Sequence, residues 1–297
     1  MNFKVVALGT AGSTPTKTRR MPSFAIIYDG DVLLFDCGEG TQMQLMTYGI
    51  SFSKIKAIFI SHAHGDHTIG IAGLVRTLSM ASRHEPLYIF VPAGYEKTIS
   101  RLLVFDKAII SFPVIIKGVK SCEVYKTRDY SVYAFRLNHT VPDYGYVFKE
   151  HDRLRFDKAK ADKLGIRGSA FSEIQRKGRL RVGSKQVLLK SITWLAKGKK
   201  VVYATDTRPS KNTVKAALGA NLLIHEAAYT EAEKKLAISR KHSTAKEAAE
   251  VAKQAKVKAL LLTHISARHK IAKPLETEAR KVFKNSRVAY DGMIVSI

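Results

Sequence analysis

The sequence predicts an α/β fold in which two mixed β-sheets pack together between layers of helices. Short apolar segments typical of strands alternate with helical segments along the whole chain of 297 residues. Several β-hairpin signals occur in each half, and no linker divides them. We therefore expect a single domain over residues 1–297 with this αββα arrangement.

The expected elements follow from runs of β-branched and aromatic residues that end at turn residues. Strands are expected at residues 3–8, 24–28 and 32–35, and the Asp29-Gly30 pair predicts a hairpin between the last two. Further strands are expected at 87–91, 132–137, 145–148, 200–204, 222–224, 259–262 and 293–297. Helices are expected at 41–48, 68–81 and 244–256.

The most informative stretch follows the apolar run at residues 57–60. It places His62, His64, Asp66 and His67 within six residues at a predicted strand-to-helix corner, where Gly65 allows a tight bend. Imidazole and carboxylate ligands together suit Zn²⁺, and the carboxylate also tolerates Mn²⁺ or Fe²⁺. Four ligand-type residues at one strand end favour a metal site over a histidine-rich surface loop.

A hydrolytic site with two metal ions needs more ligands than these four. The remaining candidates each follow a predicted strand, and they are His139, Asp206 and His264. Glu226, also at a strand end, and His242, just before a predicted helix, add a candidate acid pair. The other histidines, His84, His151 and His269, have no such placement and are expected on the surface.

Charge is the strongest compositional signal. Fifty Lys and Arg against 25 Asp and Glu give a formal net charge of +25, which makes a polyanion the first partner to consider. The alternative explanation of the charge is a basic proteome or a crowded, salty cytosol in which every protein carries excess charge. Residues 149–190 hold thirteen Lys or Arg against five Asp or Glu, and we expect a small helical hairpin there. Composition leaves two roles open for it, a solvated insertion or an anchoring arm for a polyanion.

A cytoplasmic protein is expected. No run of eighteen apolar residues supports a membrane span. The N-terminal apolar piece breaks at Gly9 and is interpreted as a first strand rather than a secretory signal. Cys37 and Cys122 lie far apart in the sequence, which argues against a disulfide scaffold.

Together these motifs resemble the metallo-β-lactamase superfamily and, within it, the ribonuclease Z family, whose members remove 3′ trailers from precursor tRNA. The similar segments are residues 9–15, 34–42, 62–67, 138–146, 205–209, 225–229, 242–244 and 262–268. The His-x-His-x-Asp-His motif alone marks the superfamily. The Asp-Thr-Arg, His-Glu-Ala and His-Ser-Thr elements, in this order, carry the narrower resemblance.

The resemblance implies a metallo-β-lactamase fold, two Zn²⁺ per subunit and a role for each candidate ligand. One ion would be held by His62, His64 and His139, and the other by Asp66, His67 and His264, with Asp206 between them. Asp66 would also orient the attacking water. His242 would be the general acid that protonates the leaving 3′ oxygen, with Glu226 raising its pKa.

Asp36 resembles a family residue that orients a ligand histidine. A helix N-cap is the alternative role for this carboxylate.

The resemblance also implies how RNA binds. Residues 149–190 resemble a projecting arm that grips the tRNA elbow from the partner subunit of a homodimer, although Gly168-Ser169 replaces the usual Gly-Pro pair. Residues 15–20 resemble a Pro-x-Lys-x-Arg-Asn loop near the cleavage site, with Arg20 where Asn is usual. The expected RNA contacts are Lys17, Arg19, Arg20, Arg176, Lys177, Arg179 and Arg181.

Two other functions remain open at this point. A superfamily hydrolase of small phosphodiesters or thioesters would use the same metal site, but it would need neither the high charge nor the basic arm. A nucleic-acid-binding protein with a structural metal would need only four ligands and no acid pair.

Overall fold

The computed structural model describes residues 3–104 and 110–297, which form two compact units. The first unit comprises Met1–Phe148 and Lys200–Ile297, and the second comprises Lys149–Lys199. Within the described part of the chain, no helix is both long enough and apolar enough to cross a membrane. Cys37 is buried, Cys122 is exposed, and both are free thiols, as predicted.

The first unit is a sandwich of two seven-stranded sheets. One sheet has the order β20-β1-β3-β4-β5-β6-β7, and its strands are β1 (Phe3–Gly9), β3 (Ser23–Tyr28), β4 (Asp31–Phe35), β5 (Ile55–Phe59), β6 (Leu87–Pro92), β7 (Val114–Val119) and β20 (Ile294–Ser296). The other has the order β19-β17-β16-β15-β10-β9-β8, and its strands are β8 (Glu123–Lys126), β9 (Tyr130–Arg136), β10 (Tyr144–Glu150), β15 (Lys200–Ala204), β16 (Leu222–Glu226), β17 (Leu260–Thr263) and β19 (Ser286–Val288). The short strands β2 (Ala11–Gly12) and β18 (Ile265–Ser266) pair separately in parallel.

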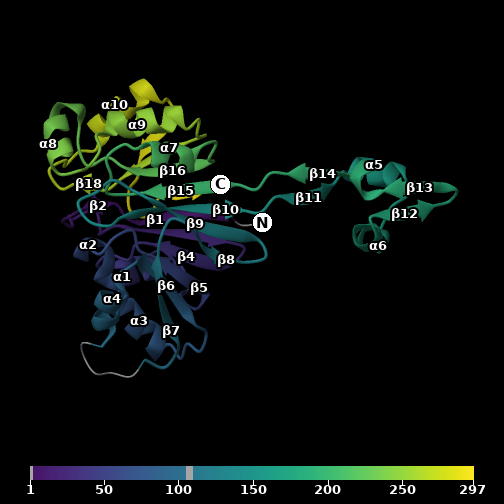
Figure 1. Ribbon diagram of the computed structural model, residues 1–297, viewed down its shortest axis with the longest axis horizontal. Coiled ribbons are helices and arrows are strands. Elements are labelled where there is room, and N and C mark those ends of the chain that lie inside the picture. Colours follow the sequence, from purple (N-terminus) through teal and green to yellow (C-terminus); the bar gives the residue numbers. More distant parts are fainter. Residues whose placement is uncertain (1–2, 105–109) are drawn as a thin grey trace. The chain divides into compact units, whose positions relative to one another are not determined.

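Helices cover the outer faces of both sheets (Figure 1). On the first sheet they are α1 (Thr41–Thr47), α2 (Gly65–Thr68), α3 (Gly70–Met80) and α4 (Glu96–Leu103), with the 3₁₀ turn η1 (Phe52–Lys54). On the second they are α7 (Lys211–Ala217), α8 (Lys234–Ser239), α9 (Ala245–Gln254) and α10 (Lys273–Val282), with η3 (Glu231–Glu233). The predicted fold class is therefore confirmed.

Aromatic side chains fill the space between the sheets. Phe35 and Phe59 of the first sheet stack with ring centroids 5.2 Å apart, and Tyr146 of the second lies 5.4 Å from Phe59. These rings are fully buried, and burial of large apolar side chains is the main force that holds two sheets face to face.

Neighbouring parallel strands bring their carboxyl ends to the same edge of each sheet. Strands β4 and β5 pair in parallel in the first sheet, as do β15, β16 and β17 in the second. The residues that follow these strands can therefore meet, although they lie far apart in the sequence. The candidate ligands are among these residues.

The second unit differs from the predicted helical hairpin. It contains the ribbon of β11 (Arg153–Phe156) with β14 (Thr193–Ala196), the hairpin of β12 (Arg179–Val182) with β13 (Lys185–Leu188), the helices α5 (Lys158–Lys163) and α6 (Ala170–Lys177), and η2 (Leu189–Ser191). Two glycines explain the hairpin. Gly178 ends α6 at φ 71° and Gly183 turns between the strands at φ 60°, a backbone region that most other residues disfavour.

The second unit also has a small apolar core of its own. Ala161, Ile166, Ile174, Val187 and Ile192 are buried together. The unit ends at Lys199 rather than at residue 190 because β14 returns along β11.

Candidate metal centre

The candidate ligands all follow β-strands of the first unit. His62, His64, Asp66 and His67 lie after β5, where the chain turns into α2. His139 follows β9, Asp206 follows β15 and His264 follows β17.

The backbone turns sharply at three positions of this edge. Asp36 has φ 58°, Asp206 has φ 43° and His264 has φ 56°. Asp and His adopt this left-handed region more readily than most residues, yet each instance still costs on the order of 1 kcal/mol. The sharp turns allow the side chains to project from the strand ends into one place.

The structure brings the seven predicted ligands into two groups. His62, His64, His139 and Asp206 form one group, and Asp66, His67 and His264 form the other. Within each group, one ligand atom per residue lies within 4.8 Å of the others. In the first group, His62 Nε2 lies 2.9 Å from His64 Nδ1.

Asp206 lies between the groups and turns one carboxylate oxygen toward each. Oδ1 lies 3.0 Å from His264 Nε2 and 3.5 Å from His67 Nε2. Oδ2 lies 3.8 Å from His62 Nε2 and 3.9 Å from His139 Nε2. A carboxylate in this position can coordinate two cations at once.

The donor set fits divalent cations. Among the described residues, the ring nitrogens Nε2 of His67, Nε2 of His139 and both of His264 are buried without a hydrogen-bond partner. A buried polar atom without a partner is costly, and a cation would satisfy these lone pairs. The mixture of imidazole and carboxylate suits Zn²⁺, Mn²⁺ or Fe²⁺.

The two carboxylates of the centre have lowered pKa values, which favours their ionised form. Burial raises the pKa of Asp66, but the adjacent imidazoles of His67 and His264 outweigh this effect and hold it below its usual range. Burial likewise acts against ionisation of Asp206, and the surrounding histidines keep its pKa low.

Asp36 contacts the ligand His67 at the ring nitrogen that faces away from the other ligands. It accepts hydrogen bonds from Ser61 N–H at 2.7 Å and from Tyr203 Oη at 2.7 Å, and its Oδ2 lies 2.7 Å from His67 Nδ1. Helix α1 is preceded by Gly40 at its N-cap position, so the alternative role of Asp36 as a helix cap is wrong.

Gly12 allows the close approach of His264. A Cβ atom at position 12 would lie 2.7 Å from His264 Nδ1 and 2.8 Å from the His264 carbonyl oxygen. Only a residue without a side chain leaves this imidazole in place.

His242 and Glu226 form a buried pair beside the ligands. His242 Nδ1 lies 2.9 Å from Glu226 Oε1, and the His242 ring lies 5.3 Å from the His264 ring between centroids. Burial lowers the pKa of His242, but the charge and hydrogen bond of Glu226 outweigh it and raise the pKa to about 9. The imidazole is therefore protonated at neutral pH and can donate a proton.

His242 also lies within reach of a cation. Asp206, His242 and His264 form a third group of ligand-type atoms within the same 4.8 Å limit. The distances alone thus allow two roles for His242, proton donor or metal ligand, and the Nδ1 contact with Glu226 is compatible with both.

The loop at residues 13–20 lies against the centre. Its Ser13 N–H donates to Asp66 Oδ2 at 3.2 Å, and Asp291 holds the loop by accepting from Arg20 N–H at 2.6 Å. The side chain of Arg19 points inward and donates to Thr10 Oγ1 and to the Ala289 carbonyl, both at 2.6 Å. Lys17 and Arg20 are exposed.

The remaining predicted RNA contacts lie in the second unit. Arg176 and Lys177 occupy the last turn of α6, and Arg179 and Arg181 lie on β12. Lys177 Nζ donates to Glu173 Oε1 at 2.6 Å, an exposed pair that contributes little stability.

Of the histidines expected on the surface, His84 is exposed. His151 and His269 are partly buried instead, and His269 Nε2 lies 3.2 Å from Glu233 Oε2. Three residues with important contacts were missed as contributors to the site, namely Asp291, Arg208 and Glu247. Arg208 had a signal in the sequence, since it belongs to the Asp-Thr-Arg element, and Glu247 had one as the last residue of a Thr-x-x-Glu capping-box pattern that begins at Thr244.

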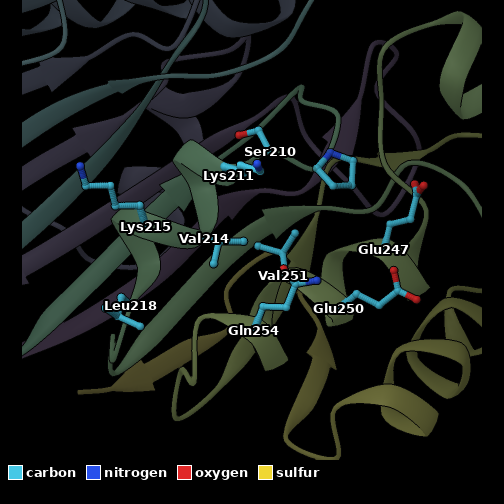
Figure 2. A pocket seen from close by; sticks show the side chains of 10 residues that line it. Ser210, Lys211, Val214, Lys215, Leu218, Glu247, Glu250, Val251 and Gln254 are labelled. Carbon is cyan, nitrogen blue, oxygen red and sulfur yellow. The ribbon is translucent and has the colours of Figure 1, made fainter.

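A separate hollow of about 520 Å³ is lined by residues of α7 and α9 and of the segment just before α7 (Figure 2). Its lining includes the apolar side chains of Val214, Leu218 and Val251 and the carboxylate of Glu247. None of the metal-site donors lines it, so it is distinct from the metal centre.

Comparisons with known proteins agree with this geometry. Residues 32–265 match the family model described as a Beta-lactamase superfamily domain. Ribonuclease Z of Methanothermobacter thermautotrophicus is 39% identical over 297 residues, which cover 99% of this chain and 97% of that protein. Ribonuclease Z of Archaeoglobus fulgidus is 40% identical over 304 residues, which cover 100% and 98%.

Solved structures are similar as well. Human tRNase Z, short form, superposes with a TM-score of 0.73 at 27% identity, with 99% of both chains covered. The metallo-beta-lactamase fold protein YhfI from Bacillus subtilis superposes with a TM-score of 0.74 at 20% identity over 100% of both chains, a likeness of fold.

Proposed function

The chain belongs to the ribonuclease Z family within the β-lactamase superfamily and is an endoribonuclease of tRNA 3′-end processing; from this premise we propose how its residues carry out the reaction. The substrate is precursor tRNA. Hydrolysis of one phosphodiester at a two-metal centre releases the 3′ trailer and leaves a 3′-hydroxyl on the tRNA.

The convergence of seven donors with an adjacent acid pair carries this proposal. Asp206 belongs to the first group of ligands and its Oδ1 lies 3.0 Å from His264 Nε2 of the second group, and His242 with Glu226 lies next to them. A structural zinc site needs four ligands and no proton donor. This arrangement therefore favours hydrolysis over a structural role for the metal.

His62, His64 and His139 would hold one cation, and Asp66, His67 and His264 the other, with Asp206 between them. We propose Zn²⁺ at both positions, while the donor set also admits Mn²⁺ or Fe²⁺. When bound, the cations would lower the pKa of a water molecule toward neutrality and attract the phosphate oxygens as their negative charge grows.

The chain's own residues supply orientation and a proton. Asp66, with one oxygen toward His67, is placed to orient the attacking water. His242 donates the proton that the leaving 3′ oxygen needs, since an alkoxide is a poor leaving group. Glu226 keeps His242 protonated, because its charge raises the pKa of the imidazole to about 9.

RNA binding uses two basic regions. Lys17 and Arg20 are exposed on the loop that contacts Asp66, while Arg19 keeps that loop folded through its interior hydrogen bonds. In the second unit, the arm, Arg176, Lys177, Arg179 and Arg181 would contact the phosphates of the tRNA body.

We place the enzyme in the cytoplasm as a homodimer, in line with the family resemblance. Met43 and Met46 lie on one face of α1 and are 60% and 58% exposed, so they offer apolar surface to a second copy. Light scattering of the purified protein would measure its mass. A monomeric mass at micromolar concentration would contradict the dimer.

The test of the function is cleavage of a precursor tRNA with a 3′ trailer, mapped to the nucleotide. The protein is assayed as purified, after chelation, and after Zn²⁺ is added back. We expect cutting next to the discriminator base or after CCA, loss on chelation and recovery with Zn²⁺. Intact precursor tRNA after incubation with fully metal-loaded protein would refute the proposal and favour a small phosphodiester or thioester substrate.

A further inference from the structure

Arg208 lies where the chain segments that carry the acid pair meet. Its guanidinium donates to both carboxylate oxygens of Glu247, from Nη1 at 2.7 Å and from Nη2 at 2.5 Å. The same Nη1 donates to the main-chain carbonyl of His242 at 2.6 Å. One side chain thus joins the loop after β15 to the backbone of His242 and to helix α9.

The neighbouring residue, Thr207, holds the other member of the pair. Its N–H donates to Glu226 Oε1 at 2.6 Å, and its carbonyl accepts a hydrogen bond from Ser243 Oγ. The Asp206-Thr207-Arg208 segment therefore contacts the metal ligands, the Glu226 carboxylate and the His242 backbone through three consecutive residues.

Glu247 fixes Arg208 from the opposite side. It belongs to α9, where Thr244 N–H donates to Glu247 Oε2 at 3.0 Å and Glu247 N–H donates to Thr244 Oγ1 at 3.2 Å. This capping box begins at Thr244, two residues after His242, and fixes the first turn of α9. Glu247 is 5% exposed and the Arg208 side chain 18%, so solvent weakens their pairing only in part.

We propose that Arg208 is a positioning residue that sets the place of His242 relative to the scissile phosphate. This inference rests on the proposed function and deepens it. His242 follows Lys241, which has φ 55°, so it sits on a bent connection between α8 and α9 rather than inside a helix. Without the guanidinium, the His242 carbonyl loses its donor and the imidazole is held mainly through Glu226.

A lysine at position 208 could not make all of these contacts. A guanidinium presents several N–H groups in a fixed plane, so it can bind a carboxylate with two hydrogen bonds and still donate to a third acceptor. An ammonium group on a flexible chain reaches one or two of these acceptors at a time. The Arg208→Lys variant should therefore be intermediate between the wild type and Arg208→Met.

The experiment compares two precursor tRNAs in single-turnover reactions at saturating enzyme. One has the normal 3′ oxygen at the scissile bond, and in the other sulfur replaces that oxygen. The thiolate leaves without being protonated, so cleavage of the sulfur substrate does not need a general acid. Zinc content, precursor affinity and circular dichroism are measured for every variant.

We expect Arg208→Met to cleave the normal substrate about 10- to 100-fold more slowly than the wild type. This loss is smaller than the loss expected when the general acid itself is removed, because His242 is still present. On the sulfur substrate its rate should lie within a few-fold of the wild type, and His242→Ala should show the same pattern. Precursor affinity and zinc content should not change. The matched control is Arg280→Met. Arg280 is an exposed arginine of α10 whose Nη1 lies 3.6 Å from Glu276 Oε1, so it too pairs with a glutamate. The Arg280→Met variant should cleave both substrates at the wild-type rate.

Equal losses on both substrates would show that Arg208 only supports the fold or the metal centre, and would overturn the inference. A wild-type rate on the normal substrate would overturn it too. If Arg208→Met does not fold, Arg208→Lys carries the same comparison. Should the wild type fail to cut the normal precursor at all, the proposed function itself would be refuted, which is a different outcome from a failure of Arg208.

Discussion

His67 Nδ1 lies 2.7 Å from Asp36 Oδ2, and this contact decides which ring atom of His67 faces the metal centre. With Nδ1 bound to the carboxylate, Nε2 points to Asp66 at 3.4 Å and to Asp206 at 3.5 Å. A carboxylate behind a ligand imidazole fixes the ring orientation and increases its basicity.

Replacing Asp36 by Ala should therefore weaken metal binding by about 10- to 100-fold, because His67 loses its orienting partner. Competition with a chromogenic chelator measures the affinity. Asp31→Asn is the control, since Asp31 accepts a hydrogen bond from Tyr130 Oη at 2.9 Å at the other end of β4. Unchanged affinity in Asp36→Ala would show that the fold alone orients His67.

Replacing His242 by Ala should slow cleavage of precursor tRNA by about 10²- to 10⁴-fold, because the leaving oxygen loses its proton donor. Zinc content and tRNA affinity should stay close to those of the wild type. Since His242 also groups with Asp206 and His264, loss of zinc in this variant would assign His242 as a ligand instead. His84→Ala, at an exposed histidine, serves as the control.

Replacing Glu226 by Gln should move the alkaline limb of the pH–rate profile to lower pH. His242 acts in its protonated form, so the rate is full below its pKa and falls above it. Glu226 raises this pKa to about 9. Removing its charge should move the midpoint of the alkaline limb to lower pH by about 1 to 3 pH units. An alkaline limb at the same pH in wild type and variant would mean that another group titrates there.

Replacing residues 151–198 by a short Gly-Ser turn should weaken binding of precursor tRNA and reduce its salt dependence, because basic residues that contact phosphates are lost. The cut is feasible since Glu150 N–H donates to the Lys199 carbonyl at 2.9 Å, so the two ends are adjacent. Filter binding at several salt concentrations measures the effect.

Hydrolysis of bis(p-nitrophenyl) phosphate is the control for this deletion and should be retained, because that small substrate has no tRNA body for the arm to bind. Equal loss on both substrates would contradict the role of the arm.

In the intact protein, Trp194 of β14 is the only tryptophan and is 55% exposed, so its fluorescence should change when precursor tRNA binds.

The ligand-type residues and the strand ends that carry them could be predicted from the sequence. His62, His64, Asp66 and His67 lie within six residues, and a strand followed by a helix is a local pattern. The internal structure of the arm was less predictable from the sequence. Its short alternating strands depend on positive φ at Gly178 and Gly183 and on the pairing of β11 with β14 across about forty residues.

The sequence by itself determined the chemistry of this protein, namely imidazole and carboxylate ligands, a basic surface and the order of motifs of the ribonuclease Z family. Only the tertiary structure decided which atoms meet. The two carboxylate oxygens of Asp206 face different groups of ligands. Asp36 accepts a hydrogen bond from Tyr203, 167 positions away in the sequence, and Arg208 donates one to the His242 carbonyl. Such contacts depend on how parallel strand ends align when the two sheets pack, and no local pattern of residues encodes them.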